Sequence, residues 1–115
     1  MTDEVKNIKE GTTSPITIQV LADGEAIDLS TASYVRVSMI DNLKAVYRYN
    51  SNDSPAYVEI TTPTTGIITF TPPSEAIFRY NKSPYRMVIW VYAADGTRYA
   101  CPEEGYNEII VEPEY

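Results

Sequence analysis

The residue types that usually carry out acid–base, nucleophilic and metal chemistry are scarce in this 115-residue sequence. It contains no His, so its one cysteine, Cys101, has no imidazole base to activate it as a nucleophile. A single Cys also excludes a disulfide framework and a thiolate metal cluster. The five Gly are spread over turns and form no phosphate-binding loop. We therefore predict a protein that is not an enzyme, with no catalytic residue, no cofactor and no metal site.

Sixteen acidic residues are the remaining candidates for chemistry, and they fall mainly into two groups, Asp23–Asp28 and Glu103–Glu114. Neither group has the spacing of an EF-hand calcium loop. No pair of carboxylates is marked out by spacing for glycoside hydrolysis. We interpret both groups as solvated acidic surface.

The charge balance limits the partners. Nine basic residues leave a net charge of −7, and an acidic surface opposes binding to nucleic acid and to anionic membranes. We expect neither as a partner. Residues Met1–Glu10 show no charged and then apolar leader, so we expect no signal peptide and synthesis in the cytoplasm.

Alternating apolar and polar residues, broken by turn signals, predict short strands throughout the chain. Asp23-Gly24 and Asp95-Gly96 are hairpin signals, and the length suits one domain. The expected strands are Ile16–Val20, Ala26–Ser30, Val35–Met39, Lys44–Tyr49, Tyr57–Thr61, Gly66–Thr71, Tyr85–Ala93, Thr97–Cys101 and Tyr106–Val111. One segment, Pro72–Asn81, is predicted to form a short helical corner between two sheets. The pattern predicts an all-β sandwich of about seven to nine strands.

The strand Tyr85–Ala93 is apolar on both faces. One face is predicted to be core: Tyr85, Met87, Ile89 and Val91. The other carries Val88, Trp90 and Tyr92, with Ile110 on a neighbouring strand, and three interpretations remain open for it. A loop or the N-terminal segment covers it, which we favour; it forms an exposed patch for another subunit; or a shift in register places Trp90 in the core.

The first thirteen residues, Met1–Thr13, are polar apart from Val5 and Ile8. We interpret them as a flexible arm or an edge strand that needs a partner, with the sandwich domain spanning residues 14–115. Such an arm can add a strand to an adjacent subunit. The predicted interface residues are Val5, Ile8, Val88, Trp90, Tyr92 and Ile110.

Ten Tyr residues raise an alternative function, because flat aromatic faces can stack on sugars. Tyrosine is also a favourable strand residue with a polar tip, and most of these lie at strand positions. A carbohydrate-binding module that attaches to host cell-surface glycans requires several tyrosines lining one cleft.

Four stretches carry a resemblance to a known family: Ile8–Thr13 leading into Ile16–Leu21; the Asp23–Ser30 turn; Thr65–Phe70; and Tyr85–Ile89 followed by Ala94–Thr97 and Pro102–Tyr106. In this order they resemble the N-terminal immunoglobulin-like domain of the baseplate upper proteins of phages that infect Gram-positive bacteria. The resemblance implies an immunoglobulin-like antiparallel sandwich. It further implies a virion structural protein of the baseplate, tail, neck or capsid surface, present in symmetric copies and contacting other virion proteins.

Overall fold

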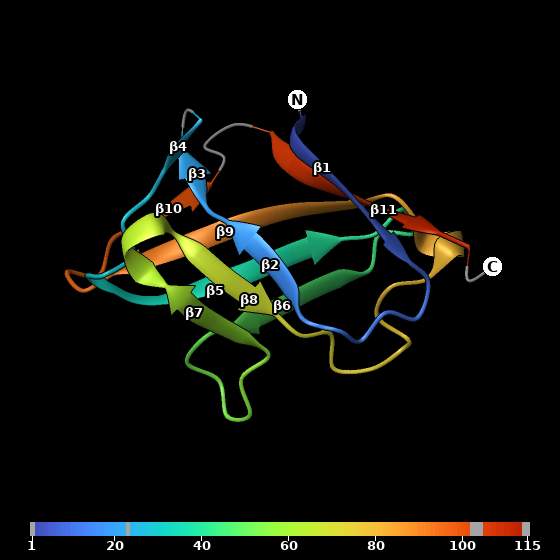
Figure 1. The fold of residues 1–115 in the computed structure, drawn as a ribbon, viewed down its shortest axis with the longest axis horizontal. Helices are drawn as coiled ribbons and strands as arrows, with labels where there is room; N and C mark the ends of the chain where they lie inside the picture. Colours follow the sequence, from blue (N-terminus) through green and yellow to red (C-terminus); the bar gives the residue numbers. More distant parts are fainter. Residues whose placement is uncertain (1, 23, 102–104, 114–115) are drawn as a thin grey trace.

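A computed structural model describes the backbone of residues 2–22, 24–101 and 105–113, and the side chains of these residues from Lys6 onward. Two β-sheets pack face to face, and a short hairpin lies beside them (Figure 1). The alternation of buried and exposed residues along the strands produces this arrangement, because successive side chains point to opposite faces. The fold is a β-sandwich of immunoglobulin-like type.

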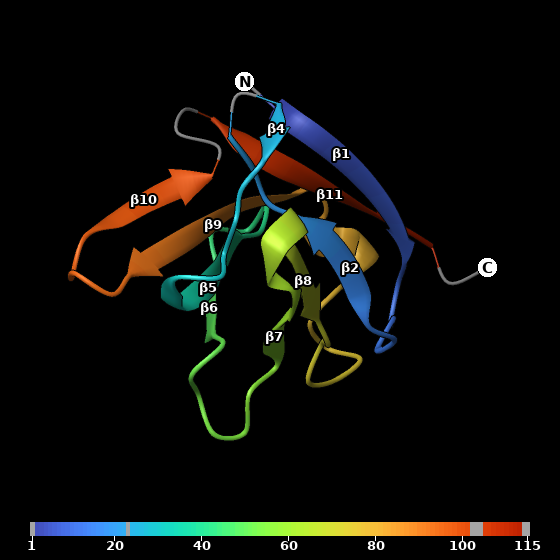
Figure 2. The same cartoon turned by 60° about the vertical axis from the view of Figure 1, so that its left-hand side comes forward.

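The larger sheet has the strand order β1-β11-β9-β5-β6, and β10 also pairs with β9. Its strands are β1 (Thr2–Lys9), β5 (Ala32–Ile40), β6 (Val46–Asn50), β9 (Tyr85–Ala93), β10 (Arg98–Cys101) and β11 (Tyr106–Glu112). Strands β10 and β11 pair with the same edge of β9, one along each half. In Figure 2 the β9–β10 hairpin projects to one side, away from the smaller sheet.

The smaller sheet has the order β2-β8-β7, and β3 pairs with β4 in a separate hairpin. These strands are β2 (Ile16–Gln19), β3 (Leu21–Ala22), β4 (Glu25–Ala26), β7 (Val58–Thr62) and β8 (Ile67–Phe70). A 3₁₀ turn, η1 (Pro63–Thr65), joins β7 to β8. The described residues thus hold eleven strands, more than the seven to nine expected, because the N-terminal segment forms β1 and the two-residue strands β3 and β4 form a small hairpin.

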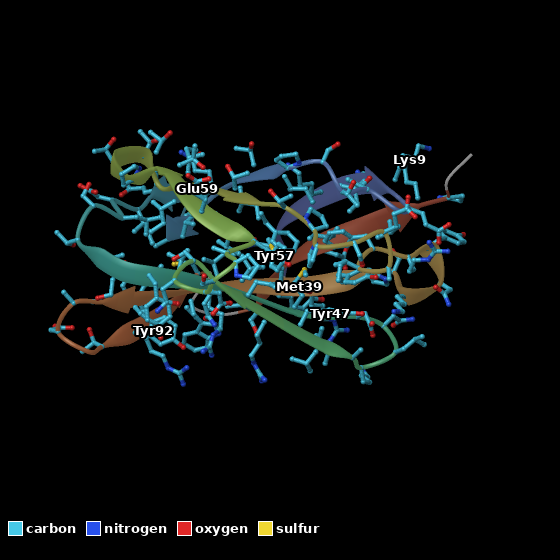
Figure 3. All side chains as sticks on the ribbon, turned by 90° about the horizontal axis from the view of Figure 1, so that it is seen from below. Lys9, Met39, Tyr47, Tyr57, Glu59 and Tyr92 are labelled. Carbon is cyan, nitrogen blue, oxygen red and sulfur yellow. The ribbon has the colours of Figure 1, made fainter. Side chains whose placement is uncertain are left out.

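The core lies between the sheets and includes the predicted inner face of β9. A chain of contacting rings crosses it from Tyr57 to Tyr47, with neighbouring centroids 5.1–6.1 Å apart. Its members are Tyr57, Tyr49, Phe70, Phe78, Tyr85 and Tyr47. Figure 3 shows Tyr57, Met39 and Tyr47 near the middle of the molecule. Of the ten tyrosines, Tyr85 is therefore a core residue and three others are partly buried against the core, and their ring contacts add to the effect of burial.

The corner between the sheets differs from the predicted helix over Pro72–Asn81. Its helical turn is the 3₁₀ segment η2 (Tyr80–Lys82), at the C-terminal end of that stretch. The side chain of Tyr85 explains the difference, because its hydroxyl bonds the carbonyl of Ile77 and the amide of Arg79. Backbone groups that a helix would use are thereby bonded to a core side chain.

The N-terminal segment is an edge strand that pairs in parallel with β11 of the same chain. Glu10 secures its end, because the amide of Glu10 donates to Glu112 O at 2.9 Å. The Glu10 carboxylate accepts the amide of Tyr80 at 2.9 Å and forms an ion pair with Arg79 at 3.3 Å. The strand thus extends the large sheet within one molecule.

The turn between β5 and β6 is organised by Asp41, whose residue surface is only 3% exposed. Its carboxylate accepts the amides of Leu43 and Ala45 at 2.8 and 3.0 Å, and the Tyr47 hydroxyl at 2.8 Å. Burial alone would raise the pKa of Asp41. The three hydrogen bonds, helped by the charge of Lys82, outweigh it and hold this pKa below the usual range.

We expect Asp41→Asn to lower the free energy of unfolding at pH 7 by about 1–2 kcal/mol, because hydrogen bonds to a charged acceptor are lost. The folded-state pKa lies below the unfolded value of 3.8, so the ionised carboxylate stabilises the fold above pH 3.8. That contribution disappears as the pH falls through the folded-state pKa. Urea titrations of both proteins from pH 7 to pH 2 test this. A difference that stays constant with pH contradicts it.

Candidate interaction surface

Three of the predicted interface residues lie together on the outer face of the large sheet. Val88, Trp90 and Tyr92 alternate with the buried residues of β9 and are each half-buried. Trp90 is therefore not in the core, and the register shift considered above is wrong. The N-terminal strand lies at the sheet edge beyond β11, so it is not the segment that covers Trp90.

Cross-strand pairing adds arginine and tyrosine side chains to this face. The register places Tyr34 opposite Tyr92, and Arg36 opposite Trp90. On the other side of β9, Arg98 pairs with Tyr92. We call this surface the arginine–aromatic face. It consists of Tyr34, Arg36, Arg48, Arg86, Val88, Trp90, Tyr92, Arg98 and Tyr106, and one acidic residue, Glu108, lies opposite Arg86 at its edge.

Guanidinium groups lie over the aromatic rings of this face. The Arg98 guanidinium is 4.5 Å from the centre of the Trp90 ring and 5.9 Å from that of Tyr92, and it also donates to the Tyr92 hydroxyl at 3.1 Å. Arg36 lies 5.4 Å from the Tyr92 ring. The ring of Tyr34 stacks on Tyr92 with centroids 4.2 Å apart. These cation–π contacts hold the guanidiniums in place along the sheet.

A shallow groove of about 290 Å³ runs along the face beside Trp90. Apolar side chains line it, among them Ile40, Val88 and the 51% exposed Val46. Arg86 lies at the groove with its guanidinium 5.0 Å from the ring of Tyr106. The surface therefore combines an apolar groove with cationic groups that form planar, bidentate hydrogen bonds to carboxylates.

The other three predicted interface residues are not part of this surface. Ile8 is partly buried and packs against the core, away from this surface. Ile110 faces outward, but β11 pairs with the start of β9, which leaves Ile110 at the far end of the face from Trp90. The side chain of Val5 lies outside the described residues.

The tyrosines do not gather in one cleft in the described part of the chain. Four lie in the core or pack against it, and Tyr34 and Tyr92 cover one another. A larger hollow of about 790 Å³ at the corner of the sandwich contains one tyrosine, the exposed Tyr80. Two acidic and two basic side chains line it, namely Glu10, Glu75, Arg79 and Lys82. Its charges balance, so it favours neither an anionic nor a cationic ligand.

Residues suited to catalysis or metal binding do not converge in the described ranges. Among residues 2–22, 24–101 and 105–113 no group of three His, Cys, Asp or Glu side chains is placed to hold a metal ion. Cys101 is a core residue, 2% exposed. The described helical segments are too short to span a membrane.

The interface prediction from the sequence included none of the arginines of this face. Their signal is period-two spacing in the outward positions of two strands, Tyr34-x-Arg36 and Arg86-x-Val88-x-Trp90-x-Tyr92. Only the pairing of β5, β9 and β10 shows that the guanidiniums lie over neighbouring rings.

Comparison with known proteins supports the fold. No protein-family model and no curated protein sequence matches the chain. Among solved structures, the chain is similar to CopC from Methylosinus trichosporium OB3b, with a TM-score of 0.54 and 13% sequence identity. The match covers 98% of this chain and 88% of that chain. At this identity the likeness concerns the β-sandwich architecture.

Proposed function

We propose that this protein is a non-enzymatic structural component of a phage virion that acts through protein–protein contacts in symmetric copies. The phage assignment rests on the resemblance to baseplate immunoglobulin-like domains. It implies a protein made in the host cytoplasm and incorporated into the particle at the baseplate, tail, neck or capsid surface. The contact surface that we propose is the arginine–aromatic face.

The observation that carries this proposal is the composition of that face. Trp, Tyr and Arg are the residue types most enriched at interface hot spots, whereas Lys and Asp are depleted there. The face combines one Trp, three Tyr and four Arg with the groove beside Trp90. The ion pairs among the described residues, Lys9–Glu112 and Arg79–Glu10, use none of these four arginines. Their charges are available to a partner.

A carbohydrate-binding role has weaker support. Sugar stacking requires an open aromatic face, and here Arg98 lies over Trp90 while Tyr34 lies over Tyr92. Binding to host glycans is therefore a result that would contradict the proposal.

The test is incorporation into particles. Quantitative mass spectrometry of particles purified from the source phage should detect this chain at a copy number that matches a symmetric assembly. Arg98→Glu should lower its incorporation at least about tenfold, the effect of a 1.4 kcal/mol loss in contact energy. Lys44→Glu is the matched control, because it makes the same charge change at an exposed turn residue outside the face.

Absence of the chain from particles overturns the virion role. Equal incorporation of the Arg98 and Lys44 variants overturns the assignment of the face. Specific retention of the protein on host cell walls, lost in Trp90→Ala, would favour the carbohydrate-binding function instead.

A further inference from the structure

The charges of this protein are segregated between its two layers. Residues 10–31 and 51–78, which we call the small-sheet layer, contain the whole small sheet and the β3–β4 hairpin and no strand of the large sheet. They include no Lys or Arg and seven of the sixteen acidic residues. The small-sheet layer alone therefore has a formal charge of −7, equal to that of the whole chain. The remainder carries nine basic and nine acidic residues and is neutral overall.

Arginine is concentrated on the surface facing away from the small sheet. Four of the five Arg of the chain, and so four of its nine basic residues, lie on the arginine–aromatic face. Figure 3 shows the two sides: Glu59 of β7 lies on one side of the sandwich and Tyr92 on the other. The acidic residues Glu25, Asp28 and Glu59 are exposed on the small-sheet layer. One molecule thus presents complementary charges on opposite sides.

We infer that copies of this protein associate head to tail, with the arginine–aromatic face of one copy against the small-sheet layer of the next. This rests on the proposed function and specifies the partner, a second copy of the chain. A twofold contact through the face would set four arginines against four others, which is unfavourable. A contact between different surfaces avoids this, and its repetition generates a ring or a linear array.

Salt concentration should modulate the association in two ways. Each copy has a net charge of −7, so copies repel one another at long range, but at 0.1 M salt this repulsion extends only about 10 Å. The local attraction between guanidinium and carboxylate groups acts within that distance. At about 1 M salt the local attraction is screened as well. We therefore expect sedimentation velocity to show concentration-dependent oligomers at 0.1 M salt that dissociate at 1 M salt.

The decisive experiment uses two variants with exposed substitutions on opposite sides. In the face variant, Arg86→Gln and Arg98→Gln remove positive charge from the arginine–aromatic face and leave the small-sheet layer intact. In the back variant, Glu25→Gln and Glu59→Gln remove negative charge from the small-sheet layer and leave the face intact. Neutral substitutions are used because charge reversal on both sides would create a new complementary pair of surfaces. Each variant alone should associate at least about tenfold more weakly than the wild type. Circular dichroism melting checks that both are folded.

Mixing the two variants separates the possible contacts. Head-to-tail association predicts a dimer of one face variant and one back variant that cannot grow further, because each retains one intact surface. A twofold contact between faces predicts no such dimer, since the face variant has no intact face. Failure of the mixture to form the dimer overturns the inference.

The same measurements distinguish this inference from the proposed function. If the wild-type protein stays monomeric up to about 1 mM, the free energy of the contact is weaker than about −4 kcal/mol. That result overturns head-to-tail association. If Arg98→Glu still lowers incorporation into particles in that case, the face binds a different virion protein and the proposed function stands. If incorporation is also unchanged, the assignment of the face is overturned together with head-to-tail association, and the virion role stands.

Discussion

Gly66→Ala is expected to lower the free energy of unfolding by about 2–4 kcal/mol, from backbone strain of about 1–2 kcal/mol and an overpacking cost of similar size. Gly66 follows η1 with a φ of +71°, a conformation that L residues with a side chain adopt at a cost. A Cβ atom at this position would lie 2.5 Å from Ile27 O and 3.0 Å from Val20 O. The amide of Ile27 donates to Val20 O. This hydrogen bond ties the two residues together, so their carbonyls cannot move freely.

Gly96→Ala provides the matched control. Gly96 has a φ of +93°, yet a Cβ atom there meets nothing within 4 Å. This substitution therefore carries the backbone cost alone, about 1–2 kcal/mol. Urea denaturation of the two variants measures the difference. Similar losses in both would show that the close approach of Ile27 and Val20 to Gly66 is relieved cheaply.

The strands that the sequence predicts well are those in which one face is buried. Ile16, Ile18 and Val20 alternate with polar residues, and all three are in the core. In β9 both faces are apolar, but the alternation still separated the buried Ile89 from the half-buried Trp90. Alternation is informative here because a shift of one residue would expose the whole inner face.

Features that depend on distant partners were harder to predict. Strand β1 is mostly polar, and its parallel pairing with β11 relies on backbone hydrogen bonds that leave little trace in the sequence. The corner over Pro72–Asn81 fits a helix by local propensity, but a tertiary contact from Tyr85 decides its conformation.

The candidate surface was predicted only in part, because some of its residues also depend on distant partners. Val88, Trp90 and Tyr92 were found because they share one strand, where spacing alone places them on one face. Arg36 and Arg98 come from neighbouring strands, so their position depends on cross-strand register. The absence of Lys and Arg from the small-sheet layer is visible in the sequence. Its consequence for the surface charge follows only from the fold, which places the strands of residues 10–31 and 51–78 in the layer opposite the large sheet.

Tyr85→Phe is expected to cost about 2–3 kcal/mol, because each buried polar group left without a partner costs about 1–3 kcal/mol. The Tyr85 hydroxyl donates to Ile77 O at 2.6 Å and accepts from the amide of Arg79 at 3.0 Å. Tyr85 itself is fully buried at the start of β9. Burial raises the pKa of this hydroxyl, so it keeps the proton that it donates. A tyrosine in this position ties the corner between the sheets to the core, as in other immunoglobulin-like sandwiches.

Tyr80→Phe removes the same atom from a residue that is 56% exposed and lies five positions away. Its expected effect is within about 0.5 kcal/mol, as for other surface substitutions. Urea denaturation measures both variants, and amide hydrogen exchange at Arg79 locates the effect. Faster exchange at Arg79 in Tyr85→Phe alone indicates that the hydroxyl holds the corner in place. Equal stability of the two variants would mean that water replaces the hydroxyl, and that the ring of Tyr85 contributes through packing against Phe78 and Tyr47.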